Sequence, residues 1–567
     1  MNVIKRLILF SKKHYKLFFI AVLASTLASL LDVSFLYLIK QCTDRHHISS
    51  EFTPAVIIAG ILLLVVCRSL FNYVAEVWIF KFGRNVIMDI RNLLYDKLLS
   101  VKISDVEKKS TGDLTTKLLY QSDQLGNGLL NFLKSVLQEG FVVIGCILAL
   151  LFMNFMMTLM VLLTFVVVAI AIQKAADYMR AHQFAVQDRL TELAHFMDQT
   201  KYAIKTVCMQ NVQKEMNHRF KHIVENHTAH QLKINKASAL SAGVIHFIIT
   251  LPLAMLIWLV LVFPNWVSAG DFAALVFGFS RIYAPMKRIS RMNVELQATI
   301  AAGDSLFTWF DVKPERRNGK KLTNQSSPSI VMDDVSVVRS GKAILKECNV
   351  TIDSGGITAF AGETASGKTT LLQVIAGLIE PDHGDFRLDD VSIKDIYLPS
   401  WRNQIGFVDQ SLPLFNLSIA ENIAFFGKLD MKRVEWACYI AALDKDVALL
   451  EAGYNHIVEY GGINLSGGQR QRVVLARAIY HAKQFIIIDE ATSALDNETE
   501  QTIYERLKSL KDITILLSSH REAGLRLADK VIVLDHGKIV ESGSYHSLLA
   551  HGGRLSQLIG SYDEIKA

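Results

Sequence analysis

The chain has 567 residues, which is too long for one compact domain and predicts at least two. Its net charge of +6 is small for this length and forms no basic stripe, so the composition gives no case for a nucleic-acid partner. The six cysteines are scattered without a CxxC pair, which argues against a metal site and against a disulfide framework.

Several stretches of the N-terminal half are apolar over the roughly 20 residues that a membrane-crossing helix needs. The first follows a basic start, Met1 to Lys16, and is too long for the apolar part of a signal peptide, so we expect a retained span and no cleavable signal. A buried helical core is the alternative, but the number of such runs disfavours it. Asn154 is expected to lie in a tight hairpin between two of them. The six spans are predicted near residues 17–40, 54–80, 135–153, 156–174, 240–263 and 268–288.

Basic residues in the loops predict how the chain is oriented in the membrane. Segments 81–134 and 174–237 are rich in Lys and Arg, whereas the loops near Asn154 and at 264–270 have none. The two long basic segments are therefore expected in the cytoplasm, and an even number of spans then places both termini there. The helical spacing of apolar residues over 87–101 predicts that these segments continue the membrane helices.

The composition changes beyond the last predicted span. Residues 311–329 are charged and contain Pro, Gly and Ser, which indicates a linker. After it, short β-rich runs alternate with helical segments, which is typical of an α/β domain with a largely parallel sheet. We therefore predict a multidomain membrane protein, with an all-α six-helix transmembrane domain over 1–310 and an α/β domain over 330–567.

A phosphate-binding loop follows the apolar run Ile357–Phe360 and precedes a helical stretch. Residues 362–369 fit the pattern G-x4-G-K-[ST]. Glycines let the backbone N–H groups face phosphates, and a helix N-terminus favours anions. Lys368 suits the β- and γ-phosphates, and the Thr369 hydroxyl suits Mg²⁺. The α/β domain is thus a P-loop ATPase cassette with ATP and Mg²⁺ as expected ligands, and the predicted nucleotide-binding residues are Gly362, Glu363, Thr364, Ala365, Ser366, Gly367, Lys368, Thr369 and Thr370.

Two carboxylates end the apolar run 485–488. A buried strand has no packing reason to end in Asp-Glu. Asp489 suits Mg²⁺, and Glu490 suits orienting and deprotonating an attacking water. A strand that emerges into solvent is the alternative for this segment taken alone.

The segment 465–469 reads LSGGQ and is followed by RQRVVLARAI. This is the signature of the ATP-binding-cassette (ABC) family, which the chain resembles. The resemblance implies that Ser466 and Gly468, with Gln469 beside them, meet the γ-phosphate of an ATP held by an opposing subunit. Backbone and hydroxyl donors at a helix start suit that anion.

Other segments match the family in order along the chain. The resemblance implies that Gln410 touches Mg²⁺ and the transmembrane domain, that 493–496 forms the D-loop, and that His520 holds the γ-phosphate. The family usually stacks adenine on an aromatic residue, and Arg339 occupies the matching position. A guanidinium can also stack on a base, so Arg339 is a candidate for that role.

The whole chain resembles the type IV exporter half-transporters, and among them the bacterial lipid A flippases. The matching segments are 109–125, 268–287 and 300–311. The resemblance implies ATP-driven export or flipping of an amphipathic lipid across the bacterial inner membrane by alternating access. It also implies a two-chain unit within membrane lipids, a homodimer or, alternatively, a heterodimer.

Several rival functions stay open or are excluded. A multidrug or peptide exporter is the main alternative. An ATP-gated channel or regulator is disfavoured because Glu490 and His520 are intact. Importers of this family usually place spans and cassette on separate chains, and the predicted spans exclude a soluble cassette ATPase.

Ionisable residues inside spans are costly and indicate function. By resemblance, Arg68 and Lys287 match positions that contact a phosphorylated headgroup, and Asp32 joins them as a substrate-site candidate; Glu76 is also ionisable. An ion pair between helices, such as Asp32 with Arg68, is the alternative. Lipid A flippases carry basic residues where this chain has Ala284 and Gln173, so the cargo is left open among related amphipathic molecules.

Overall fold

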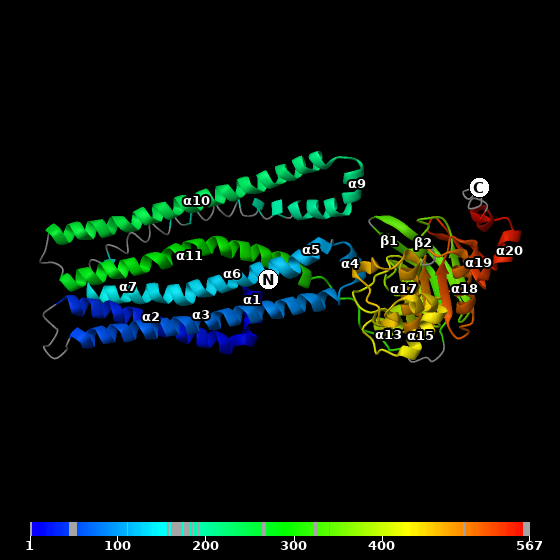
Figure 1. Ribbon diagram of the computed structural model, residues 1–567, viewed down its shortest axis with the longest axis horizontal. Coiled ribbons are helices and arrows are strands. Elements are labelled where there is room, and N and C mark those ends of the chain that lie inside the picture. Colours follow the sequence, from blue (N-terminus) through cyan, green and yellow to red (C-terminus); the bar gives the residue numbers. More distant parts are fainter. Residues whose placement is uncertain are drawn as a thin grey trace. The chain divides into compact units, whose positions relative to one another are not determined.

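The computed structural model forms two compact units (Figure 1). The membrane unit spans Met1–Val101 and Asp105–Pro314, and the cassette spans Lys102–Ser104 and Glu315–Ala567. The extent of the linker over 311–329 stays a prediction. The structure describes residues 3–44, 54–109, 111–155, 192–262, 268–322, 327–339, 341–490 and 494–559, with isolated positions between 158 and 190.

The membrane unit is built from long helices. With 45 residues, α3 is roughly 65 Å long at about 1.5 Å per residue, twice the hydrocarbon core of a bilayer. The second predicted span and the helical segment predicted after it thus form one helix as far as Leu98, and its extension past the bilayer stays a prediction. The helices are α1 (Val3–Ser11), α2 (Tyr15–Thr43), α3 (Pro54–Leu98), α4 (Ile103–Glu107), α5 (Thr111–Thr115), α6 (Ser122–Lys134), α7 (Phe141–Met153), α9 (Ile204–Met209), α10 (Gln213–Val262) and α11 (Ala269–Phe310), with a 3₁₀ turn at Lys12–His14 and π-helical turns at Thr116–Gln121 and Ser135–Gly140.

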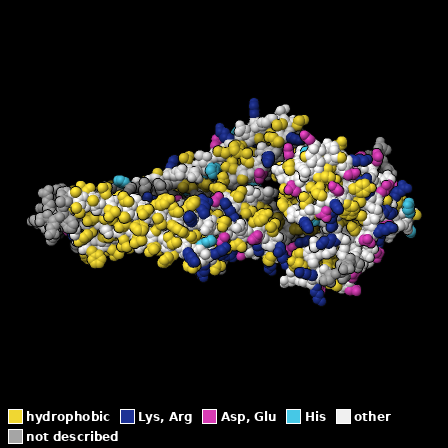
Figure 2. All heavy atoms as spheres, turned by 60° about the horizontal axis from the view of Figure 1, so that its bottom comes forward, with side chains coloured by type: hydrophobic (Ala, Val, Ile, Leu, Met, Phe, Trp, Pro, Cys, Tyr) yellow, Lys and Arg dark blue, Asp and Glu magenta, His cyan; other side chains and the backbone are white. Residues whose placement is uncertain are grey.

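Three helical stretches of the described residues are long and apolar enough to cross a membrane, namely Lys5–Thr43, Ala55–Leu98 and Thr111–Met153. They contain the first and third predicted spans, and the second except for Pro54. The fourth, 156–174, lies largely outside the described residues, and the last two coincide with parts of α10 and α11 except for one terminal residue each. Figure 2 shows hydrophobic side chains over much of the membrane unit's visible surface, as a lipid environment requires.

A tight turn ends α7. Asn154 has extended backbone, with φ −151° and ψ 97°, and its N–H donates to the Leu150 carbonyl. The Thr158 N–H donates back to the Asn154 carbonyl at 3.1 Å. The chain therefore leaves the helix at Asn154, where the turn was predicted, while the hairpin itself stays a prediction because most of the fourth span lies outside the described residues.

The cassette contains two sheets. An antiparallel sheet has the order β2-β1-β4-β5 and was not predicted. A second sheet has the order β10-β9-β3-β8-β7-β6 and is parallel except for β10, which confirms the predicted α/β class. The strands are β1 (Ile330–Arg339), β2 (Lys342–Ile352), β3 (Ile357–Ala361), β4 (His383–Leu388), β5 (Val391–Ser392), β6 (Ile405–Val408), β7 (Phe485–Asp489), β8 (Thr514–Ser518), β9 (Lys530–Asp535) and β10 (Lys538–Gly543).

The central strands β3, β7 and β8 are buried along their whole length, which explains their continuous apolar sequences. Because they are parallel neighbours, the residues that follow them meet at one edge of the sheet. The helices around this sheet are α12 (Lys368–Ile375), α13 (Leu398–Arg402), α14 (Ile419–Ala424), α15 (Met431–Ile440), α16 (Asp444–Leu449), α17 (Gly467–His481), α18 (Asn497–Lys508), α19 (Glu522–Leu527) and α20 (Tyr545–Ala550).

Candidate functional site

The phosphate-binding loop lies between β3 and α12, as the sequence predicts. Two of its glycines adopt conformations that other residues avoid, with φ of +150° at Gly362 and +109° at Gly367. A Cβ on Gly362 would lie 2.4 Å from the Leu534 carbonyl oxygen. The loop can therefore curl against β9 only with glycine at this position.

Lys368 is held inside the loop. Lys368 is only 4% exposed, and its Nζ donates to the carbonyls of Gly362 and Glu363, each at 2.9 Å. Burial lowers the pKa of Lys368, and the carboxylates of Glu490 and Asp489 oppose that shift. The Lys368 ammonium group is thus held at the position where a phosphate chain would bind.

Asp489 ends β7 and is buried. Ser518 Oγ donates to its Oδ1 at 2.7 Å. Burial raises the pKa of Asp489, while hydrogen bonds from the side chains of Ser518 and Thr369 lower it. Within the described chain, Asp489 Oδ2 and Ser366 Oγ are buried without a hydrogen-bond partner of good geometry.

An unpaired buried carboxylate oxygen is costly unless a cation lies beside it. Thr369, Asp489 and Gln410 offer oxygen donors of the kind that Mg²⁺ prefers. The residues at this site therefore fit Mg²⁺, although the predicted ligand set itself stays a prediction.

The three residues predicted to be catalytic come together at the sheet edge. Glu490 Oε1 lies 2.7 Å from His520 Nε2, and Gln410 Nε2 donates to Glu490 Oε2 at 3.2 Å. Glu490 has a left-handed backbone, φ +50°, and its N–H donates to Ser518 Oγ at 2.9 Å. Such strain in a non-glycine residue is typical of functional sites.

The signature segment forms the start of α17. Ser466 Oγ accepts from the Gln469 N–H, and the Gln469 side chain accepts from the Ser466 N–H, which is a capping box. Gln469 Nε2 also donates to Asp446 at 3.1 Å. Gln469 is thus engaged in capping, and Ser466 and Gly468 have no hydrogen bond to the phosphate-binding loop among the described residues.

The remaining predicted nucleotide residues are less constrained by the geometry. Arg339 is the last residue of β1 and is partly exposed, so its stacking role stays a prediction. Asp496 caps α18 by accepting from the Thr499 N–H at 2.9 Å. Ser493, at the start of the predicted D-loop, lies outside the described residues.

Within the membrane unit, Asp32 joins two arginines. Asp32 is 8% exposed on α2, and its Oδ1 lies 2.7 Å from Arg68 Nε on α3 and 3.0 Å from Arg281 Nη2 on α11. The ion pair that the sequence left open as an alternative is therefore present. Lys287 lies in α11, and its side chain falls outside the part that the structure describes.

A cavity of about 290 Å³ opens beside this cluster. Two more ion pairs line it, Arg288 with Glu139 at 2.7 Å and Lys134 with Glu76. Its described lining includes four basic and three acidic side chains, so the cavity carries one net positive charge (Asp32, Arg68, Glu76, Lys134, Glu139, Arg281 and Arg288).

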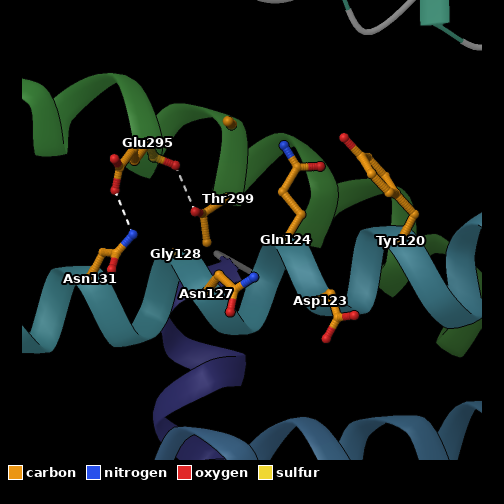
Figure 3. Close-up of a pocket in the computed structure, with 9 residues that line it drawn as sticks. Tyr120, Asp123, Gln124, Asn127, Gly128, Asn131, Glu295 and Thr299 are labelled. Carbon is orange, nitrogen blue, oxygen red and sulfur yellow. Dashed lines mark hydrogen bonds between the residues drawn. The ribbon is translucent and has the colours of Figure 1, made fainter. Parts of the chain in front are cut away.

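A second cavity, of about 510 Å³, lies between α6 and α11 (Figure 3). Asn131 Nδ2 donates to Glu295 Oε2 at 2.8 Å, and Thr299 Oγ1 donates to the Glu295 carbonyl at 2.6 Å. None of the described residues that line it is basic. It therefore does not suit a phosphorylated headgroup.

Comparison with known proteins decides the family. The model of the ABC transporter transmembrane region matches residues 18–286, and the ABC transporter model matches 345–493. The ATP-dependent lipid A-core flippase of Legionella pneumophila (strain Paris) is 30% identical, over 98% of this chain and 95% of that protein. The chain belongs to the ABC transporter family.

Other relatives of this ABC transporter are similar to it over almost the full length. The ATP-dependent lipid A-core flippase of Haemophilus ducreyi is 30% identical over 96% of each chain, and that of Coxiella burnetii is 28% identical over 98% of this chain and 95% of that protein. A bacterial Atm1-family ABC exporter with ATP bound has the same fold, with a TM-score of 0.85 at 20% identity, covering 96% of this chain and 98% of that one.

The predicted exporter fold and resemblance are therefore confirmed. The transporter is a membrane protein with a C-terminal cassette, and it is an ATP-binding ATPase coupled to transport. Sequence reasoning missed two residues of its sites. Arg281 is a charge inside a predicted span, so the rule that singled out Arg68 could have found it. Ser518, which bonds both Asp489 and the Glu490 backbone, carries no signal in the sequence.

Proposed function

We propose that this transporter uses ATP hydrolysis to flip or export an amphipathic lipid, lipid A-like or related, across the bacterial inner membrane by alternating access. The observation that carries the proposal is its full-length similarity to proteins named ATP-dependent lipid A-core flippases. The cluster of Glu490, His520 and Gln410 supports the hydrolytic part.

The geometry supports the following roles for residues at the nucleotide. Lys368 and the loop N–H groups hold the phosphates. Glu490 orients and deprotonates the attacking water, and His520 fixes the Glu490 carboxylate and reaches the γ-phosphate. Mg²⁺, when bound through Thr369, Asp489 and Gln410, would supply charge stabilisation for the phosphoryl oxygens.

We infer that two copies of the chain form the working unit, because among the described residues Ser466 and Gly468 make no hydrogen bond to their own phosphate-binding loop. A second copy related by C2 symmetry would complete both nucleotide sites. A heterodimer with a related chain stays the alternative.

The cassette and both termini are proposed to lie in the cytoplasm. The basic segments 81–134 and 174–237 support this orientation, since basic loops remain on the cytoplasmic side. The length of α3 exceeds one bilayer thickness, which leaves room for part of the segment 81–134 outside the membrane.

The cavity beside Asp32 is the proposed headgroup site. Because Asp32 pairs with both Arg68 and Arg281, much of the positive charge there is already balanced. We therefore propose a headgroup with fewer negative charges than a bis-phosphorylated lipid A. Lys287, near the end of the sixth predicted span, stays a candidate for contact with the headgroup.

The test is ATPase activity of the purified transporter in nanodiscs, titrated with lipid A, singly charged and zwitterionic phospholipids, hydrophobic drugs and peptides. Saturable stimulation by a lipid, weakened in Arg68→Ala and Lys287→Ala, supports the proposal. Stimulation only by drugs or peptides would identify the alternative exporter class instead. Asp304→Asn, at an exposed carboxylate of α11, is the control for charge removal.

A further inference from the structure

The phosphate-binding loop carries an acidic side chain. Within residues 362–369, Lys368 is the basic residue and Glu363 the acidic one, so their formal charges cancel. A site for a triphosphate gains from positive charge, and a carboxylate in the loop opposes it. Some other group must compensate Glu363 if the loop is to bind ATP well.

Arg554 makes that compensating contact. Its Nη2 lies 2.8 Å from Glu363 Oε1 and 3.3 Å from Asp535 Oδ1. Asp535 ends β9, the strand whose Leu534 carbonyl closes against Gly362. The guanidinium therefore joins the loop to the strand that supports it.

The C-terminal segment holds Arg554 in place. Leu555 and Leu558 are 0% and 4% exposed and belong to the main core of the cassette. The backbone N–H groups of Arg554 and Leu555 both donate to the Glu541 carboxylate of β10. The cassette core and β10, which both lie outside the nucleotide site, thus hold the backbone of Arg554 in place.

We propose that Arg554 is a positioning residue for nucleotide binding, which pairs with Glu363 and so cancels the negative charge of the phosphate-binding loop. Without it, the Glu363 carboxylate is free to face the phosphates. The proposal rests on ATP binding by the cassette and not on the identity of the cargo, so lipid-stimulated ATPase assays test the two separately.

The expected effect follows from the charges. The Glu363 side chain is 57% exposed, so the pair adds little to folding stability. Its field still reaches phosphates within about 8 Å at physiological ionic strength. For a carboxylate at that range from two phosphate charges in water, we expect Arg554→Ala to weaken ATP binding about fivefold at low ionic strength and about twofold at physiological ionic strength.

The experiment is equilibrium ATP binding to the full-length transporter in nanodiscs, without Mg²⁺ so that no hydrolysis occurs. Four proteins are compared, namely wild type, Arg554→Ala, Glu363→Gln and the double variant. Arg554→Lys tests whether the charge suffices, and Arg526→Ala, at an exposed arginine of α19, controls for net charge. Binding is repeated with adenosine and at several salt concentrations.

Weaker ATP binding in Arg554→Ala, recovery in the double variant and unchanged adenosine binding would support the proposal. The loss should shrink at high salt, since screening weakens the repulsion. If the double variant binds ATP as weakly as Arg554→Ala, or adenosine binding falls equally, Arg554 only anchors the C-terminal segment and the proposal is wrong. Wild-type ATP binding by Arg554→Ala would overturn it as well.

Discussion

The nucleotide site and the membrane cavity are assembled in different ways. In the cassette, the site residues lie at or just after the ends of buried parallel strands. Formation of the sheet is therefore enough to bring Asp489, Glu490 and His520 together. In the membrane unit, Asp32, Arg68 and Arg281 come from three helices and meet only through side-chain pairing. A site on strand ends is specified by backbone register, whereas a site between helices depends on charge balance.

In the nucleotide site, the largest loss of activity is expected from substitution of Glu490. Glu490→Gln keeps the shape of the side chain but cannot accept a proton, and general-base catalysis contributes about 10²- to 10⁴-fold. We expect ATPase activity to fall by at least about 100-fold, while ATP binding is retained. Phosphate release and equilibrium ATP binding measure the two quantities. Near-wild-type turnover would contradict the role given to Glu490.

The membrane cavity should respond to loss of the Asp32 carboxylate. Asp32→Asn leaves Arg68 and Arg281 without their shared anion, and breaking a buried pair costs about 3–5 kcal/mol. Because both arginines are partly exposed, we expect the free energy of unfolding to fall by about 2 kcal/mol. Thermal unfolding in nanodiscs measures it, with Asp304→Asn as the control.

The same variant sharpens the proposal on cargo. Removing the Asp32 charge raises the net positive charge of the cavity, so stimulation of the ATPase should shift toward lipids with more negative charge. If Asp32→Asn changes neither stability nor lipid preference, the ion-pair cluster is not the headgroup site.

A smaller effect is expected at the start of α17. Ser466→Ala removes the cap of this helix, and such a loss costs about 1 kcal/mol. Ser466→Thr restores the hydroxyl and should restore the melting temperature of the cassette. If Ser466 also contacts ATP across a dimer, Ser466→Ala should weaken ATP-dependent dimer closure more than Gln469→Ala does, as measured by crosslinking between copies.

The smallest expected effect concerns cysteine reactivity. Burial raises the pKa of the Cys438 thiol in the cassette core to about 12, whereas Cys42 and Cys208 of the membrane unit are exposed. Because the thiolate is the reactive form, maleimide should label Cys208 and spare Cys438 until the protein is denatured. Mass spectrometry of labelled peptides measures this, and early labelling of Cys438 would show that the core opens.

Local sequence determined much of the cassette site. The loop at 362–369, the carboxylates after the run 485–488 and the capping pattern at Ser466 are contiguous, and each depends on neighbours within a few residues. In a parallel sheet, the loop at 362–369 and the two carboxylates follow neighbouring strands and so meet at one edge. The apolar runs of the membrane unit were recognisable for the same reason, since a span needs only length and composition.

Only the tertiary structure decided which charges pair. Arg281 lies 249 residues from Asp32, and Arg554 lies 191 residues from Glu363, so no local pattern links them. Ser518 meets Asp489 because β7 and β8 are in register, and the antiparallel sheet depends on pairing between distant strands. Residues that the backbone of one sheet brings together can be predicted from local sequence. An ion pair between distant elements depends on how their side chains pack in three dimensions.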